Sequence, residues 1–376
     1  MVGSLNAVLV LEDGSIFYGR GFGFPKTVVG EVVFTTGMVG YPESITDPSY
    51  RGQILCFTYP LIGNYGVPRF DLKDSWGIPI NFESDKPHVL GVIVHELCER
   101  PSHWSCGMSL HEWLFNEGIP GIYGIDTRML TKKLRSKGVM LGVLQVSEGD
   151  IDVESLFSLI EKAPRYDMLD LVGEVTIEKP VVYENNGPTV VVIDCGVKYG
   201  IIRSLLYRGL RVVRVPRDYG VDKILSFDPK GVVISNGPGN PEVNVETIKC
   251  IHGLIEIGIP ILGICLGNQM IGLALGASTF KLKYGHRGQN KPCINLDFNR
   301  CYVTSQNHGF AIREDSLDGS GLIVWWLNAD DKTIEGLKHS KKPLISVQFH
   351  PEASPGPYDA SFVFDMFIEL MELNRV

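Results

Sequence analysis

Apolar runs and amphipathic segments alternate along the C-terminal half of the sequence. The runs are short and almost wholly apolar, as in strands that are buried on both faces of a sheet. The segments between them repeat apolar residues at helical spacing. We predict strands at residues 189–193, 210–215, 231–235, 259–264, 322–327, 333–337 and 344–349, and helices at 198–208, 223–227, 244–257 and 360–373. This alternation with short connections favours an α/β fold with a mostly parallel sheet and helices on both faces.

The N-terminal half has a different pattern. Two β-rich runs, 7–12 and 15–19, are joined by Asp13-Gly14, a two-residue turn signal that predicts a hairpin. Further strands are expected at 32–36 and 90–95, and helices at 109–117 and 127–136. We therefore expect a mixed α/β domain over residues 1–150.

A connecting segment separates the two halves. It begins with a helical pattern at 153–162 and continues with a polar stretch at 170–187 that is interrupted by Gly and Pro. Such composition is typical of a domain boundary. We predict a second domain over residues 188–376, joined to the first by a helix and linker at 151–187.

The composition is that of a globular chain of 376 residues, 44% hydrophobic and 21% charged. Its 35 Lys and Arg against 43 Asp and Glu give a formal net charge of −8, which disfavours binding to nucleic acid or an anionic membrane. No apolar run approaches the ~20 residues that a bilayer span requires. Residues 1–6 carry no basic segment ahead of an apolar core, so we expect no signal peptide. The expected location is the cytoplasm.

One of the eight cysteines has a distinctive context. No CxxC pair occurs, and a chain of this size does not need disulfides, so we expect reduced thiols that mostly pack as small hydrophobes. Cys265, however, lies in the motif GICLG (263–267), between a predicted strand and a helix that reaches residue 275. This is the thiol counterpart of a nucleophile elbow, and a helix N-terminus favours thiolate over thiol. We predict that Cys265 is a catalytic nucleophile.

A nucleophile requires a base, and the base requires an orienting partner. The motif His350-Pro351-Glu352 follows the predicted strand 344–349. In an extended backbone, residues two apart project to the same side, so both side chains can face one site. We predict that His350 is the base and that Glu352 holds its imidazole tautomer, in a cysteine triad.

The loop SNGPGNP (235–241) follows another predicted strand. Because Gly237 has no side chain, its backbone N–H can approach a substrate closely. Together with the N–H of Leu266, it is predicted to form an oxyanion hole, in which one donor stabilises the transition state by about 3–4 kcal/mol.

These motifs resemble a known family. GICLGNQ, SNGPGNP and the distal HPE are similar to the motifs of class I glutamine amidotransferases, whose triad is Cys-His-Glu. The N-terminal half resembles the domain peculiar to the small subunit of carbamoyl-phosphate synthetase, in the stretches LEDGSIFYGRGFG, GEVVFTTGMVGYPESITDPSYRGQI, FTYPLIGNYG and GIPGIYGIDTRMLTKKLR. The similarity extends to DCGVKYGIIRSL, KYGHRGQNKP, SQNHGFA and HPEASPGPYDA, and so covers nearly the whole chain.

The resemblance implies roles for individual residues. Cys265 is expected to be the nucleophile, His350 the base and Glu352 its orienting partner. Contacts to the substrate L-glutamine are implied for Ser49, Gly237, Gly239, Leu266, Gln269, Asn307, Gly309 and Phe310. Because Ser49 belongs to the N-terminal half, the substrate is expected between the two domains. No metal or cofactor is expected in this chain.

The resemblance also implies a partner. Glutamine would be hydrolysed to glutamate and ammonia through a Cys265 thioester. The ammonia would pass to a large synthetase subunit, which uses ATP, Mg²⁺ and bicarbonate to make carbamoyl phosphate for arginine or pyrimidine synthesis. Three positions depart from the family: Asn268 and Lys291 stand where histidine is usual, and Gly200 where asparagine is usual.

Alternatives are open at the level of sequence. The spacing of His95, Cys98, His103 and Cys106 resembles a two-plus-two zinc site, although packing is the simpler interpretation. The amidotransferase half could serve another synthetase, but other class I amidotransferases lack the N-terminal half. A non-enzymatic scaffold subunit with a degenerate site is disfavoured by the intact triad.

Overall fold

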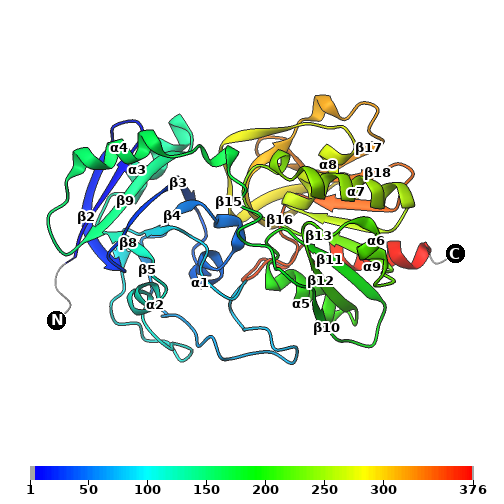
Figure 1. Cartoon of the computed structure of the whole chain (residues 1–376), viewed down its shortest axis with the longest axis horizontal. Coiled ribbons are helices and arrows are strands. Elements are labelled where there is room, and N and C mark those ends of the chain that lie inside the picture. The colour runs from blue at the N-terminus through cyan, green and yellow to red at the C-terminus, as the bar shows by residue number, and fades with distance from the viewer. Residues whose placement is uncertain (1–4, 375–376) are drawn as a thin grey trace. The chain divides into compact units, whose positions relative to one another are not determined.

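The chain divides between residues 169 and 170 into two units, an N-terminal unit (1–169) and a C-terminal unit (170–376). The computed structural model describes residues 5–374 (Figure 1). The division falls inside the predicted connecting segment 151–187. Helix α4 (Val153–Lys162) packs on strands of the N-terminal unit, whereas β10 (Val181–Tyr183) pairs with a strand of the C-terminal unit. The connecting segment is therefore shared between the two units.

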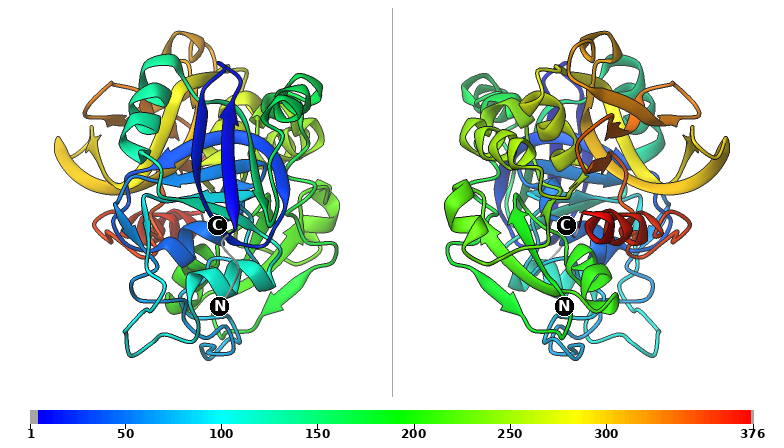
Figure 2. Two further views of the ribbon diagram at one scale, coloured as in Figure 1. Left: turned by 90° about the vertical axis from the view of Figure 1, so that its left-hand side faces the viewer. Right: turned by 90° about the vertical axis from the view of Figure 1, so that its right-hand side faces the viewer.

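The N-terminal unit is built on a closed barrel. Its strands follow one another around the barrel in the order β1-β2-β8-β6-β4-β3-β9, and β9 pairs with β1 to close it. The predicted hairpin is β1–β2, the dark blue pair in Figure 2. The elements are β1 (Asn6–Leu11), β2 (Ile16–Gly23), β3 (Thr27–Thr35), α1 (Tyr41–Ile45), β4 (Gln53–Phe57), β5 (Leu61–Ile62), β6 (Gly91–Ile93), β7 (Glu96–Leu97), α2 (Leu110–Asn116), β8 (Pro120–Tyr123), α3 (Thr127–Lys137) and β9 (Met140–Ser147). The mixed α/β character was predicted, but barrel closure was not.

The C-terminal unit is built on a ten-stranded sheet, with the order β10-β12-β11-β13-β14-β19-β18-β17-β15-β16. The strands from β12 to β19 in this order pair in parallel and form the predicted centre of the sheet. The elements are β11 (Thr189–Asp194), α5 (Tyr199–Tyr207), β12 (Arg211–Pro216), α6 (Val221–Leu225), β13 (Gly231–Ile234), α7 (Val245–Ile257), β14 (Ile261–Ile264), α8 (Leu266–Ala274), β15 (Thr279–Asn295), β16 (Arg300–Ile312), β17 (Leu322–Asn328), β18 (Ile334–His339), β19 (Leu344–Val347) and α9 (Val363–Leu373).

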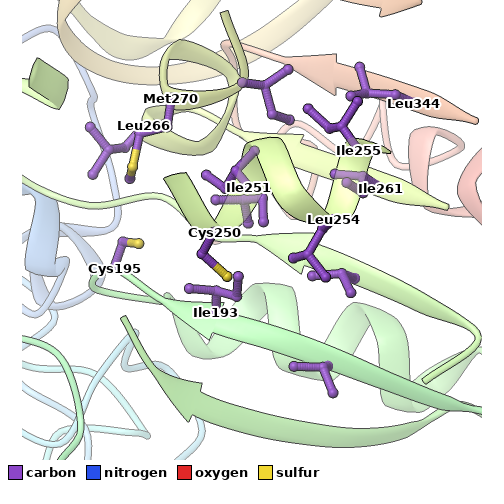
Figure 3. Packing of buried hydrophobic residues seen from close by; sticks show 14 of the residues in the cluster. Ile193, Cys195, Cys250, Ile251, Leu254, Ile255, Ile261, Leu266, Met270 and Leu344 are labelled. Carbon is purple, nitrogen blue, oxygen red and sulfur yellow. The ribbon is translucent and has the colours of Figure 1, made fainter. Parts of the chain in front are cut away.

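Helices cover both faces of the parallel centre, as predicted. Ile193 of β11 packs in one apolar cluster with Ile251 of α7 and Met270 of α8 (Figure 3). Neighbouring residues of a strand point to opposite faces of the sheet, so the residues next to Ile193 in β11 face away from this cluster. At Gly231 of β13, an added Cβ would lie 2.5 Å from the sulfur of Met371 in α9, so α9 covers the opposite face.

The long antiparallel ribbon β15–β16, yellow in Figure 2, was not predicted. Its register shifts between Lys281 and His286 and again between Gly288 and Lys291. These irregularities break the alternation of apolar and polar residues by which a strand is recognised. The ribbon matters because β16 supplies part of the site described below. None of the helices in residues 5–374 is long and apolar enough to cross a membrane.

Candidate active site

Cys265 is the residue between β14 and α8, so the predicted strand–turn–helix context is present. Its backbone has φ of 55° and ψ of −103°, a region that residues with a side chain rarely adopt. Such a conformation costs about 1–3 kcal/mol and persists only where the surroundings impose it. The Cys265 N–H donates to the carbonyl of Val347 at 2.8 Å, which ties the elbow to the end of β19.

The glycines of the elbow allow close packing of helix and strand. A Cβ at Gly267 would lie 2.2 Å from the carbonyl oxygen of Ile234, and one at Gly263 would lie 2.4 Å from the side chain of Ile271. Neither distance is possible for a real side chain. The motif therefore uses glycine to bring α8 onto β13 and β14, and the strained conformation is confined to Cys265.

The structure brings His350 and Glu352 into direct contact, directly beyond β19. The His350 Nδ1 and the Glu352 Oε1 are 2.6 Å apart, and both side chains are buried. The His350 N–H donates to the carbonyl of Ser305 at 2.9 Å, which fixes its backbone against β16. The second ring nitrogen, Nε2, is buried and has no hydrogen-bond partner among the described residues. The ring is thus held at one nitrogen and left open at the other.

The electrostatics of the pair favour a charged imidazole. Burial alone would lower the pKa of His350, but the negative charge of Glu352, aided by Cys265, outweighs it and raises the pKa to about 10. Burial would raise the pKa of Glu352, but the positive charges of Lys198 and His350 outweigh it and lower the pKa to about 2. At neutral pH, His350 is therefore an imidazolium that can give up a proton from Nε2.

Lys198 is a member of the site that the sequence analysis missed. Its Nζ lies 2.9 Å from the Glu352 Oε1, the same oxygen that faces His350, and both side chains are buried. Its charge lowers the pKa of His350 and so limits the effect of Glu352. A usable signal was present, because Lys198 follows β11 at the carboxyl edge of the parallel sheet, where ligands bind in such folds.

The two predicted oxyanion-hole residues lie together. A Cβ at Gly237 would fall 2.0 Å from the carbonyl oxygen of Cys195 and 2.8 Å from the side chain of Leu266, so only glycine fits there. Leu266 is the first residue of α8, and the N–H groups of a first turn have no acceptor inside their helix. Gly239, in the same loop as Gly237, has φ of 84°, a conformation that glycine adopts without strain.

Other predicted glutamine contacts also gather near Cys265. The Cys265 Sγ donates to the carbonyl of Asn307 in β16 at 3.6 Å. The Gln269 side chain, in the first turn of α8, donates from Nε2 to the carbonyl of Phe310 at 2.8 Å. Gly309 lies between Asn307 and Phe310 on the same strand.

Ser49 lies in the N-terminal unit, in a short 3-10 helix (Pro48–Tyr50). Its N–H donates to the Oδ1 of Asp47 at 2.9 Å, and the residue is buried. This fixes the backbone around Ser49, while its predicted contact with glutamine stays a prediction.

Cys265 was expected to be presented at the edge of the sheet. Only 2% of its surface is exposed, so it is more enclosed than expected. Glutamine can reach the sulfur only through an opening among the surrounding residues. The benefit of enclosure is a low local dielectric, in which the N–H dipoles and the imidazolium act more strongly than in water.

Two further groups of residues could suggest a metal. Within residues 5–374, the one cluster of three close potential ligands is His286, His308 and Glu335, and the set around Cys98 forms no such cluster. His286 contacts the carboxylates of Asp331 at 2.9 Å and Glu335 at 3.3 Å. Burial would lower the pKa of His286, but these two carboxylates outweigh it and raise the pKa to about 9. The two carboxylates hold the His286 ring by hydrogen bonds.

Of the other cysteines, four are buried and fit the expectation of packing, whereas Cys98 and Cys106 are partly exposed and Cys301 is exposed. All eight thiols are unpaired. Cys195, which also follows a strand, is buried, and burial raises the pKa of its thiol well above the ordinary value. It therefore has the environment of an inert core cysteine.

Comparison with known proteins agrees with this geometry. Residues 191–370 match the family described as glutamine amidotransferase class-I. The fold, the elbow and this match define the C-terminal unit as a class I glutamine amidotransferase. Residues 9–144 match the carbamoyl-phosphate synthase small chain, CPSase domain.

Full-length relatives identify the family. The chain is 49% identical to the carbamoyl phosphate synthase small chain of Sulfurisphaera tokodaii, over 97% of this chain and 96% of that one. It is also 49% identical to the small chain of Pyrococcus furiosus, over 97% of each. The multifunctional protein CAD of Squalus acanthias matches 96% of this chain within 16% of its own length, at 49% identity. The chain belongs to the carbamoyl phosphate synthase small chain family, as the sequence resemblance implied.

Proposed function

We propose that Cys265, His350 and Glu352 hydrolyse L-glutamine to glutamate and ammonia. One observation carries this proposal: a strained cysteine lies at a strand–helix elbow and acts electrostatically on His350, whose Nδ1 is 2.6 Å from a buried carboxylate oxygen. Each role in a cysteine triad is then filled by a residue of matching chemistry.

The reaction follows from the geometry in two steps. The Cys265 sulfur attacks the carboxamide carbon as a thiolate, and the N–H groups of Leu266 and Gly237 stabilise the negative charge on the oxygen. The His350 Nε2 gives its proton to the departing nitrogen, so that ammonia leaves and a γ-glutamyl thioester remains. Water then attacks the thioester carbon, His350 accepts a proton from that water, and glutamate leaves as the thiolate is restored. Seven of the expected glutamine contacts, all but Ser49, lie in the C-terminal unit.

The ammonia is proposed to serve a large synthetase chain. The curated relatives are small chains of carbamoyl phosphate synthase, a designation that implies a larger partner. Ammonia released into water is mostly protonated and no longer nucleophilic, so transfer must be shielded from solvent. ATP, Mg²⁺ and bicarbonate are assigned to the partner, which would form carbamoyl phosphate for arginine or pyrimidine synthesis. The N-terminal unit is the proposed docking domain, because it holds none of the three triad residues and only one of the expected glutamine contacts, Ser49.

A glutamine-mimetic electrophile tests the assignment of the nucleophile. We expect a chloroketone analogue of glutamine to label Cys265 with a stoichiometry of one, and excess glutamine to protect it. Cys301, an exposed thiol, is the internal reference: a simple alkylating reagent should label it with or without glutamine. Peptide mass spectrometry locates the label. A scaffold subunit would show no glutamine-sensitive label at Cys265.

A further inference from the structure

A chain of buried polar side chains runs behind the nucleophile elbow and ends at Gln269. Its members are Ser346 of β19, Asn268 of α8 and Gln348, which directly follows β19. Ser346, Asn268 and Gln348 have no exposed surface, and Gln269 has 2%. None of the first three is assigned a role by the triad chemistry.

The orientation of each amide in this chain is set by its neighbour. The carbonyl of Phe310 can only accept, so the Gln269 atom 2.8 Å from it must be the amide nitrogen. The same nitrogen is 3.1 Å from Gln348, whose facing atom must therefore be the oxygen. That oxygen also accepts from the Asn268 Nδ2 at 3.3 Å. The Asn268 Oδ1 then accepts from the Ser346 hydroxyl at 2.7 Å.

The order of donors and acceptors in the network determines which atom of the Gln269 amide is left for the substrate. Both N–H groups of the Gln269 amide are used, one on Phe310 and one on Gln348. No donor among the described residues reaches the Gln269 Oε1. The network therefore presents Gln269 to the substrate as an acceptor, able to bind an N–H group but not a carbonyl or a carboxylate oxygen.

The arrangement is maintained at a cost. The Gln348 Nε2 is buried and has no hydrogen-bond partner among the described residues. An orphaned donor of this kind destabilises a protein by about 1–3 kcal/mol. A leucine of similar volume would remove the orphaned donor but would leave the N–H groups of Asn268 and Gln269 without their acceptor, so the glutamine serves the network rather than its own hydrogen bonds. Buried unsatisfied groups of this kind are expected where function requires them.

The position of Gln348 links the network to the catalytic pair. Gln348 lies two residues before His350, and Asn268 lies three residues after Cys265. The backbone N–H of Gln348 donates to the carbonyl of Glu335 at 2.8 Å, which fixes where its side chain starts. One side chain thus connects the segment that carries the base to the helix that carries the nucleophile.

We infer that Gln348 is a positioning residue that, with Asn268 and Ser346, locks the Gln269 amide with its oxygen toward an N–H group of glutamine. The inference rests on the proposed glutaminase function. It also accounts for the departure at position 268, because asparagine and neutral histidine each offer a donor nitrogen and an acceptor atom. Either residue can accept from Ser346 and donate to Gln348, so the order of donors and acceptors in the network is kept.

The first test is Gln348→Leu, assayed for glutaminase activity in the full chain bound to its large chain. We expect the KM for glutamine to rise about tenfold or more, which corresponds to about 1.4 kcal/mol of binding. We expect kcat to stay within about threefold. We expect the melting temperature to fall, because the loss of the Gln348 Oε1 leaves buried N–H donors of Gln269 and Asn268 unpaired, which outweighs the removal of the orphaned Nε2. An unchanged KM, or a fall in kcat as large as the rise in KM, would overturn the inference.

Two variants at position 268 test whether a side chain with a donor and an acceptor is sufficient to maintain the KM for glutamine. Asn268→His keeps a donor and an acceptor and should hold the KM within about threefold, whereas Asn268→Leu, of similar size to histidine, should raise it. Asn295→Leu is the control for general destabilisation: this buried amide accepts from the N–H of Phe298, outside the network, and its loss should leave the KM unchanged. If the wild-type complex hydrolyses glutamine and the two variants at 268 behave alike, the inference fails while the proposed function stands.

Discussion

Replacing Cys265 with serine is expected to abolish glutamine-dependent carbamoyl phosphate synthesis by the complex and to leave synthesis from added ammonium intact. The hydroxyl of serine is a far weaker nucleophile than the thiol, and no other thiol stands at the elbow. Removal of a nucleophile typically costs about 10⁴–10⁶-fold in rate. The measurement is carbamoyl phosphate formation with glutamine or ammonium as the only nitrogen source.

Cys301→Ser is the matched control, because Cys301 is exposed and outside the site. The Cys301→Ser complex should make carbamoyl phosphate at the wild-type rate from glutamine and from ammonium. An equal loss with glutamine and with ammonium in Cys265→Ser would contradict the proposed division of labour between the two chains.

Replacing His350 with asparagine has the second largest expected effect. Asparagine can accept a hydrogen bond but cannot carry the proton that departing ammonia requires, nor remove one from water. General acid–base catalysis of this kind contributes about 10²–10⁴-fold, so we expect kcat of glutaminase to fall by that factor. The KM for glutamine should change much less, because His350 acts on the reacting atoms. Steady-state glutamate release measures both constants.

His252→Asn controls for the loss of a histidine as such. His252 is an exposed residue of α7 whose ring contacts the carbonyl of Ala274, and its replacement should leave glutaminase activity unchanged. A His350→Asn variant that retained kcat within a few-fold would mean that another group moves the proton.

The sequence was sufficient to predict the strands that precede Cys265 and His350 and the helix that follows Cys265. Apolar runs marked β11, β13 and β14 because strands buried on both faces leave a simple pattern. Cys265 could be located because glycines at 263 and 267 carry a steric requirement that the sequence displays directly. His350 and Glu352 were predicted to face one site from an extended backbone, which was wrong in detail. Strand β19 ends at Val347, and a turn closed by the N–H of Ala353 on the carbonyl of His350 at 3.1 Å carries Glu352.

Contacts across long sequence separations were harder to predict. Lys198 reaches Glu352 over 154 positions, and Asn268 reaches Gln348 over 80, and no local pattern reports either pair. In the sequence, these side chains cannot be distinguished from ordinary polar residues, because only the folded sheet brings their elements together. The ribbon β15–β16 was missed for another reason, since its register shifts erase the alternation on which strand prediction depends.

The central claim is that glutamine is attacked by the Cys265 sulfur, and an acid quench during turnover tests it most directly. The full complex is mixed with glutamine, quenched within milliseconds to seconds, digested and analysed by mass spectrometry. The account predicts a γ-glutamyl group on the peptide that contains Cys265, absent from the Cys265→Ser variant. Glutamate release at the wild-type rate with no adduct on that peptide at any quench time, or an adduct on another residue, would contradict it.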